Sequence, residues 1–259
     1  MEMITARTND KIKYAALLAS SSSKRAEYGE FFLEGARLCS DAAQTGIAVV
    51  RAFFTKDALT KYESYIAVIR EKCDECYTVS ADVAAKLSDT GSSQGVFCIC
   101  RVRNTEGVSL KRNGRYIALE NVQDPSNLGA VCRSCEALGI DGVIVSGGCD
   151  VYNPKALRAA MGSSLRINLI TADNLPAFIK KANEAGMLTL ASVPSSEAKD
   201  IRSFAFKDGA IICVGNEGNG LTQETKSACS STVTIPMEGR AESLNASVAA
   251  AILAWELKR

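Results

Sequence analysis

The chain has 259 residues with no histidine, an apolar fraction of 47% and a formal net charge of +1. This apolar fraction suffices to bury the cores of one large domain or two ordinary ones, and the lack of histidine excludes Ser-His and Cys-His nucleophile mechanisms. No run approaches the roughly 18 apolar residues of a membrane span, and the first residues lack the apolar core of a signal peptide, so we expect a cytoplasmic protein without membrane contact.

The first hundred residues alternate helical patterns with short apolar runs, as a small α/β domain does. The spacing of apolar residues predicts helices at 33–45, 61–73 and 82–87. Apolar runs predict strands at 49–54, 77–79 and 95–102. The following stretch is polar, charged and glycine-containing, as linkers are. We therefore predict a first domain at 1–105, a linker at 106–114 and a second domain at 115–259.

The second domain shows a more regular alternation. Its apolar runs lie at 116–119, 142–145, 187–191, 211–214 and 233–235, with helix-length segments between them. Near-continuous apolar strands that alternate with helices predict an α/β fold with a mostly parallel sheet covered on both faces. Ligands of such sheets bind beyond the carboxyl ends of the strands, so the loops that follow these runs are the candidate site.

Three of these loops stand out. Loop 120–133 offers Asp124, Ser126 and Asn127 as helix caps before a helix that runs through Leu138 and carries Arg133. The segment 214–221 holds three glycines and fits neither a P-loop nor a dinucleotide fingerprint, but it could wrap a flat adenine or ribose and present Glu217. Taken alone, the first loop could equally be an ordinary capped helix. The second could be a flexible turn, but loops at this edge of the sheet usually carry function.

The third loop, 235–245, leads into an alanine-rich helix with Ser243 as the expected N-cap. Small side chains on most faces of this helix suit close packing on the sheet or on a second copy of the chain. By itself the segment indicates only a loop followed by a buried helix.

The remaining features leave alternatives open. Two Cys-x-x-Cys pairs, Cys73 with Cys76 and Cys132 with Cys135, formally allow a four-thiolate zinc site, but their apolar surroundings favour reduced core cysteines, and we predict no metal. Basic residues exceed acidic ones in 1–26 and in 101–115, which suits either phosphate contacts or a solvated face and a charged linker.

The three loops together resemble the signature motifs of the SpoU (TrmH-like) branch of the SPOUT methyltransferases. The first motif is matched by 127–133, the second by 214–221, and the third by 235–237 with 243–245. The resemblance implies an S-adenosylmethionine-dependent methyltransferase that acts on a ribose 2'-hydroxyl of RNA, works as a homodimer and forms a trefoil knot with its last strands and helix. Residues 32–38 and 94–96 resemble that family's ribosomal-protein-like RNA-binding domain.

The resemblance also implies roles for nine residues. Backbone groups around four of them would hold S-adenosylmethionine: Gly215, Ile235, Met237 and Leu244. Five would line the reaction centre: Asn127, Arg133, Glu217, Ser243 and Asn245. Arg133 would act on the hydroxyl and its neighbouring phosphate, either as a general base or as a fixed charge that stabilises the developing alkoxide. Glu217 would hold Arg133, while Ser243 and Asn245 would orient the hydroxyl or the cofactor carboxylate.

Two other activities compete with this interpretation. A catalytically silent RNA-binding protein would keep the fold without cofactor affinity, and a related knotted enzyme would methylate a base. The intact motifs oppose the first, and the block 243–245 favours the ribose over a base. The ribosomal-protein-like first domain favours large-subunit ribosomal RNA over transfer RNA as the substrate.

Overall fold

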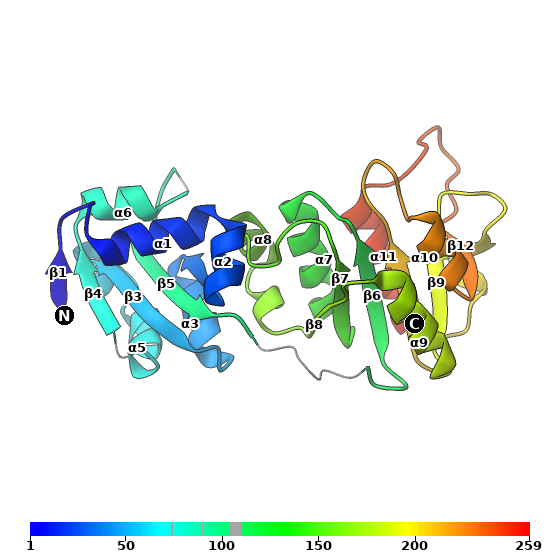
Figure 1. Cartoon of the computed structure of the whole chain (residues 1–259), viewed down its shortest axis with the longest axis horizontal. Helices are drawn as coiled ribbons and strands as arrows, with labels where there is room; N and C mark the ends of the chain where they lie inside the picture. The colour runs from blue at the N-terminus through cyan, green and yellow to red at the C-terminus, as the bar shows by residue number, and fades with distance from the viewer. Residues whose placement is uncertain (74, 90, 104–109) are drawn as a thin grey trace. The chain divides into compact units, whose positions relative to one another are not determined.

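The computed structural model describes residues 1–73, 75–89, 91–103 and 110–259, which form two compact units (Figure 1). The first unit comprises Met1–Asn104 and Tyr152–Leu165, and the second comprises Thr105–Val151 and Arg166–Arg259. Of the predicted linker, 106–109 lies outside the described residues. The segment Tyr152–Leu165 falls inside the predicted second domain, yet it packs with the first unit.

The first unit is a five-stranded sheet with helices on both faces. The strand order is β1-β4-β3-β5-β2, with β1 and β3 parallel to β4, and β5 antiparallel to β3 and β2. The strands are β1 (Glu2–Ile4), β2 (Glu30–Glu34), β3 (Val49–Thr55), β4 (Glu75–Val79) and β5 (Val96–Arg101). The helices are α1 (Asp10–Ser20), α2 (Ser22–Tyr28), α3 (Ala36–Gln44), α4 (Lys56–Lys61), α5 (Glu63–Glu71), α6 (Ala81–Leu87), α8 (Pro154–Ala160) and the 3-10 turn η1 (Ser163–Leu165).

The predicted strands of this unit match β3, β4 and β5, and the predicted helices match α3, α5 and α6, but the start of the first of them was wrong. Leu33 lies in β2 rather than in a helix, because the chain turns at Gly35, whose φ of 112° suits glycine, and α3 begins only at Ala36. The helix expected at 61–73 is α5, and the sequence analysis missed the short helix α4 that precedes it. A short apolar run such as 31–33 fits a buried strand as well as a helix, so periodicity could not separate them.

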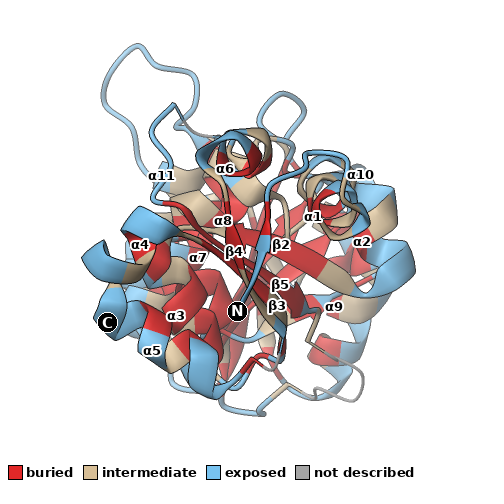
Figure 2. Ribbon diagram, turned by 90° about the vertical axis from the view of Figure 1, so that its left-hand side faces the viewer, coloured by how far each residue is buried: buried red, intermediate tan, exposed pale blue. Residues whose placement is uncertain are grey.

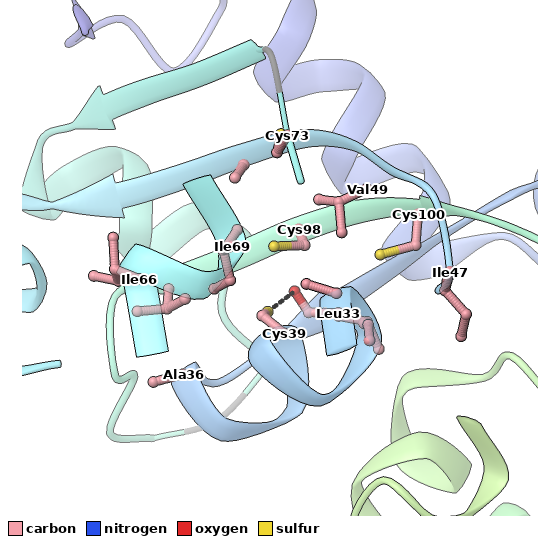
Figure 3. Packing of buried hydrophobic residues seen from close by; sticks show 14 of the residues in the cluster. Leu33, Ala36, Cys39, Ile47, Val49, Ile66, Ile69, Cys73, Cys98 and Cys100 are labelled. Atoms are coloured by element: carbon pink, nitrogen blue, oxygen red, sulfur yellow. Dashed lines mark hydrogen bonds between the residues drawn. The ribbon is translucent and has the colours of Figure 1, made fainter. Parts of the chain in front are cut away.

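Cysteines help to fill the core of the first unit (Figure 3). The cluster under α3 and α5 includes Cys39, Cys98 and Cys100, and Cys39 Sγ donates to Leu33 O at 3.8 Å. Burial raises the pKa of the Cys98 and Cys100 thiols well above their ordinary value, so both stay protonated and act as small apolar side chains. Strands β2, β3 and β5 of this unit are mostly buried, while most of β1 and the outer faces of the helices are exposed (Figure 2).

The second unit contains a seven-stranded parallel sheet, which confirms the predicted α/β fold with a mostly parallel sheet. The strand order is β10-β12-β9-β11-β6-β7-β8. The strands are β6 (Arg115–Glu120), β7 (Gly142–Ser146), β8 (Leu169–Thr171), β9 (Leu188–Ser192), β10 (Lys199–Asp200), β11 (Ala210–Val214) and β12 (Ser231–Thr234). The helices are α7 (Pro125–Ala137), α9 (Leu175–Glu184), the 3-10 turn η2 (Ile201–Ser203), α10 (Gln223–Ala228) and α11 (Ala246–Lys258). The sequence did not predict β8 and β10, which are very short.

Parallel pairing brings the predicted loops together. Strands β6 and β11 are neighbours, with Leu119 opposite Val214, so the loops that follow both strands leave the same edge of the sheet. Helix α11 packs against α7, β6 and β11, whereas α9 and α10 pack against each other.

The trefoil knot stays a prediction. Among the described residues, no helix is long and apolar enough to cross a lipid bilayer.

Candidate active site

The loop between β6 and α7 forms one side of the site. Asp124 caps α7 as predicted, since its side chain accepts a hydrogen bond from Ser126 N at 2.9 Å, and Pro125 opens the helix. Asn127 lies in the first turn and is buried, with 8% of its surface exposed. The cap therefore fixes the side chain of Asn127 near the carboxyl ends of the parallel strands.

Glu217 connects the glycine-rich loop to this helix start. Its carboxylate accepts hydrogen bonds from Asn127 Nδ2 at 2.9 Å and from the backbone amides of Gln123 and Asp124, both at 3.1 Å. Burial raises the pKa of Glu217, but these donors outweigh it and leave the pKa below its ordinary value. Glu217 is therefore a carboxylate at neutral pH.

Asn245 extends the chain of contacts to α11. Asn245 Nδ2 donates to Asn127 Oδ1 at 3.1 Å, while Asn245 Oδ1 accepts from Ser247 N and Val248 N at the start of α11. The carboxylate of Glu217 needs a donor at one end of this row, and the N–H groups of α11 need an acceptor at the other end. Only this orientation of the two side-chain amides satisfies both. Three of the predicted residues thus lie in one hydrogen-bonded row.

The predicted cap at Ser243 was wrong, because Asn245 is the N-cap of α11. Serine and asparagine are both good caps, and the sequence does not show which of them stands at the residue where the chain turns into the helix. Ser243 instead lies in the preceding loop and is exposed.

Hydrogen bonds of the Asn216 side chain hold the glycine-rich loop in its conformation. Asn216 Oδ1 accepts from Gly218 N at 2.8 Å and Asn219 N at 3.1 Å, and Asn216 Nδ2 donates to Asn121 O at 2.8 Å. A Cβ on Gly215 would stand 2.1 Å from the carbonyl carbon of Gly220, so no other residue fits at this position. The glycine pattern therefore has a structural cause in the loop itself.

A cavity of about 440 Å³ opens between the second and third loops. It contains all four predicted cofactor positions together with Glu217 and Ser243, whereas Asn127, Arg133 and Asn245 lie outside its lining. The lining residues are Ser192, Val193, Pro194, Val214, Gly215, Asn216, Glu217, Gly218, Asn219, Gly220, Leu221, Lys226, Thr234, Ile235, Met237, Glu242, Ser243, Leu244, Ala246 and Ala249.

The sequence analysis missed the contribution of the loop after β9 to this cavity. Ser192 ends that strand, and Val193 and Pro194 follow it. The rule that ligands bind beyond the carboxyl ends of parallel strands could have found them, since 187–191 was predicted as a strand. Lys226 was also missed, because nothing in the local pattern of α10 distinguishes it from a solvated lysine.

Arg133 is placed differently from the expectation. It is exposed on α7, and within the described part of the chain it makes no hydrogen bond or ion pair. The hydrogen bonds of Glu217 go to Asn127, Gln123 and Asp124, so the expected contact with Arg133 is not formed. The guanidinium fork is therefore available to an external ligand.

The cysteine pairs do not resemble a metal centre. Cys73 Sγ donates to Glu75 O at 3.6 Å, and Cys132 and Cys135 are buried in α7. Over the residues that the structure describes, no group of three or more cysteine or acidic side chains is arranged to hold a metal ion.

Comparison with known families now decides the identity. Residues 114–255, more than half of the chain, match the SpoU rRNA Methylase family. The chain belongs to the SpoU rRNA methylase family. Residues 9–98 of this SpoU family member match a second domain family, the MRM3-like substrate binding domain.

Individual SpoU relatives resemble the chain along its whole length. The 23S rRNA (guanosine(2553)-2'-O)-methyltransferase RlmP of Bacillus subtilis is 29% identical over 264 residues, which cover 100% of this chain and 100% of the relative. The 23S rRNA (uridine(2479)-2'-O)-methyltransferase of Streptomyces viridochromogenes is 27% identical and covers 99% of this chain and 91% of its own length. The AdoMet-bound crystal structure of an rRNA methyltransferase from Sinorhizobium meliloti has a TM-score of 0.88 at 27% identity, over 99% of this chain and 97% of that one.

Proposed function

We propose that the chain transfers a methyl group from S-adenosylmethionine to a ribose 2'-hydroxyl of large-subunit ribosomal RNA. The observation that carries this proposal is the cavity built from the second and third motifs, with Asn127, Glu217 and Asn245 hydrogen-bonded beside it. The full-length likeness to relatives named as 23S rRNA 2'-O-methyltransferases supports the ribose and the RNA class.

The cavity fits a nucleoside of this type. Its volume of about 440 Å³ lies in the range of small-molecule sites. Met237 and Leu244 are 37% and 36% exposed on its wall, and Gly215 leaves its backbone without a side chain, so an apolar ring can lie against these residues. When bound there, S-adenosylmethionine supplies an electrophilic methyl group on a sulfonium centre. Backbone groups around Gly215, Ile235, Met237 and Leu244 would hold it.

Arg133 is proposed to act on the RNA. Its guanidinium, which has no partner among the described residues, presents a planar fork of donors that matches a phosphate together with a neighbouring hydroxyl. A fixed positive charge there stabilises alkoxide character, while a general-base role requires a neutral guanidine, a form that arginine hardly adopts in proteins.

Replacing Arg133 with lysine tests both roles, because each requires the fork. We expect methyl transfer to fall at least tenfold, since a lysine keeps the charge but loses the bidentate geometry. Arg202→Lys changes an exposed arginine paired with Asp200 and serves as the matched control, with activity near wild type. Wild-type activity of Arg133→Lys would remove Arg133 from the reaction.

Asn245 and Ser243 are proposed to orient the hydroxyl or the carboxylate end of the cofactor. Asn245→Ala should lower methyl transfer more than cofactor affinity, and equal losses would reassign Asn245 to cofactor binding. Asn245→Asp separates the roles, because it keeps the oxygen that caps α11 and loses the Nδ2 donor to Asn127.

The proposed active form is a homodimer assembled on α11. Val248, Ile252 and Trp255 recur at helical spacing on this helix and are 47%, 36% and 61% exposed. An exposed apolar stripe of this kind suits burial against a second copy of the chain. In the described parts of the chain none of the ten cysteines forms a disulfide, which supports the reducing cytoplasm as its compartment.

The decisive experiment combines binding and transfer. Isothermal titration should detect S-adenosylmethionine binding, and labelled methyl groups should enter 23S RNA when total RNA from a strain that lacks the gene is the substrate. Label in transfer RNA alone would move the substrate to that class. A chain that binds no S-adenosylmethionine would be a silent RNA-binding member of the family.

A further inference from the structure

Glu120 is a buried carboxylate that the proposed function does not use. It is the last residue of β6, and only 5% of its surface is exposed. It does not line the cavity, so it touches no ligand there. A buried charge of this kind is costly unless donors surround it.

Three donors meet this carboxylate, and all come from the start of α10. Thr222 N donates at 2.7 Å and Thr222 Oγ1 at 2.9 Å, while Thr225 Oγ1 donates to the same oxygen as Thr222 Oγ1. Thr222 is the N-cap of α10, and Thr225 is completely buried. Since these partners lie 102 and 105 residues further along the chain, the contact joins β6 to α10 across the sheet edge.

The two threonines that bind Glu120 are flanked in sequence by residues that line the cavity. Gly220 and Leu221 line the cavity immediately before Thr222, and Lys226 lines it immediately after Thr225. The glycine-rich loop is therefore held twice, by Glu217 in its middle and by Glu120 where it enters α10.

We propose that Glu120 is a positioning residue that holds the glycine-rich loop and the start of α10 in the geometry that binds the nucleoside cofactor. The inference rests on the proposed function of the cavity. A buried carboxylate can keep all three donors in only one arrangement, so it restricts the loop to a single position before the ligand arrives. A wall that is ordered in advance binds more tightly, because less conformational freedom is lost on binding.

The test compares Glu120→Gln, which keeps the shape of the side chain, with Thr225→Val, which removes one donor without changing volume. For both variants we expect the Kd and the KM for S-adenosylmethionine to rise about tenfold, the effect of losing one hydrogen bond to a charged group. The kcat and the KM for RNA should stay within about twofold of wild type, because Glu120 touches neither the RNA nor the reacting atoms.

Asn183→Ala is the matched control, because Asn183 lies in α9 and binds the opposite end of α10. Asn183 Nδ2 donates to Ala228 O at 2.8 Å, and its Oδ1 accepts from Thr189 Oγ1 at 2.6 Å, away from the cavity. This variant should lower the unfolding temperature and leave the Kd unchanged.

The outcomes separate the two proposals. In one outcome, wild type and Glu120→Gln bind S-adenosylmethionine equally well, and only the stability or the binding stoichiometry of the variant is reduced. Glu120 then has a structural role, as Asn183 does, and the inference is overturned. If wild type itself does not bind S-adenosylmethionine, the proposed function fails first.

Discussion

Replacing Asn127 with alanine should loosen the row of contacts from Glu217 to α11. The change removes the hydrogen bond to Glu217 at 2.9 Å and the one from Asn245 at 3.1 Å. A hydrogen bond to a charged group contributes about 1.5–3 kcal/mol and a neutral one about 0.5–1.5 kcal/mol. Since Glu217 and Asn245 are both exposed, water replaces part of each contact, and we expect a loss near the lower end of the sum, about 2 kcal/mol.

Thermal unfolding measures this loss. For the second unit, which has about 140 residues, 2 kcal/mol corresponds to a fall of about 4–8 °C in its unfolding temperature. A double-mutant cycle with Asn245→Ala should show a coupling of about 0.5–1.5 kcal/mol. Ser126→Ala, on the preceding residue of α7, is the control and should change stability by less than about 0.5 kcal/mol. An Asn127→Ala variant as stable as this control, with additive effects in the cycle, would refute the reasoning.

Three further predictions follow from the same geometry. Gly215→Ala should abolish S-adenosylmethionine binding in calorimetry, because its Cβ would collide with Gly220; binding at wild-type affinity would contradict the tight turn. The lowered pKa of Glu217 means that its contribution to stability is present above the unfolded pKa of about 4.3 and is lost as the pH falls through the lower folded value. The difference in unfolding temperature between wild type and Glu217→Gln should therefore close as the pH is lowered from 7 to about 3, and a pH-independent difference would show that the charge is not involved. Trp255→Lys should convert a dimer into a monomer in light scattering, while an unchanged mass would exclude the α11 face.

Local patterns predicted the parts of the site that depend on local geometry. The glycines of 214–221 and the cap at Asp124 are readable because the turn and the helix start need those residues wherever the chain runs. The parallel sheet was predictable because its strands are buried on both faces and read as continuous apolar runs.

The contacts that assemble the site could not be read in this way. The partners Asn127 and Asn245 are 118 residues apart, and their loops leave the same edge of the sheet because β12 and β6 belong to one parallel sheet, in the order β12-β9-β11-β6. The sequence placed Glu120 in the loop after the strand, and its role as a buried acceptor was not predicted because its donors come from α10, far along the chain. Nothing in the sequence of the helix at 154–160 shows which unit it packs with, so its packing with the first unit was not predicted.

The position of the transferred methyl group shows whether the chain methylates the ribose or the base. Ribosomal RNA methylated by the purified chain with labelled S-adenosylmethionine is digested to nucleosides and analysed by mass spectrometry. The account predicts that the label stays with the ribose after the base is cleaved, at one nucleotide of 23S RNA, and that alkali fails to cut the chain after that nucleotide. Label that leaves with the base would contradict the account.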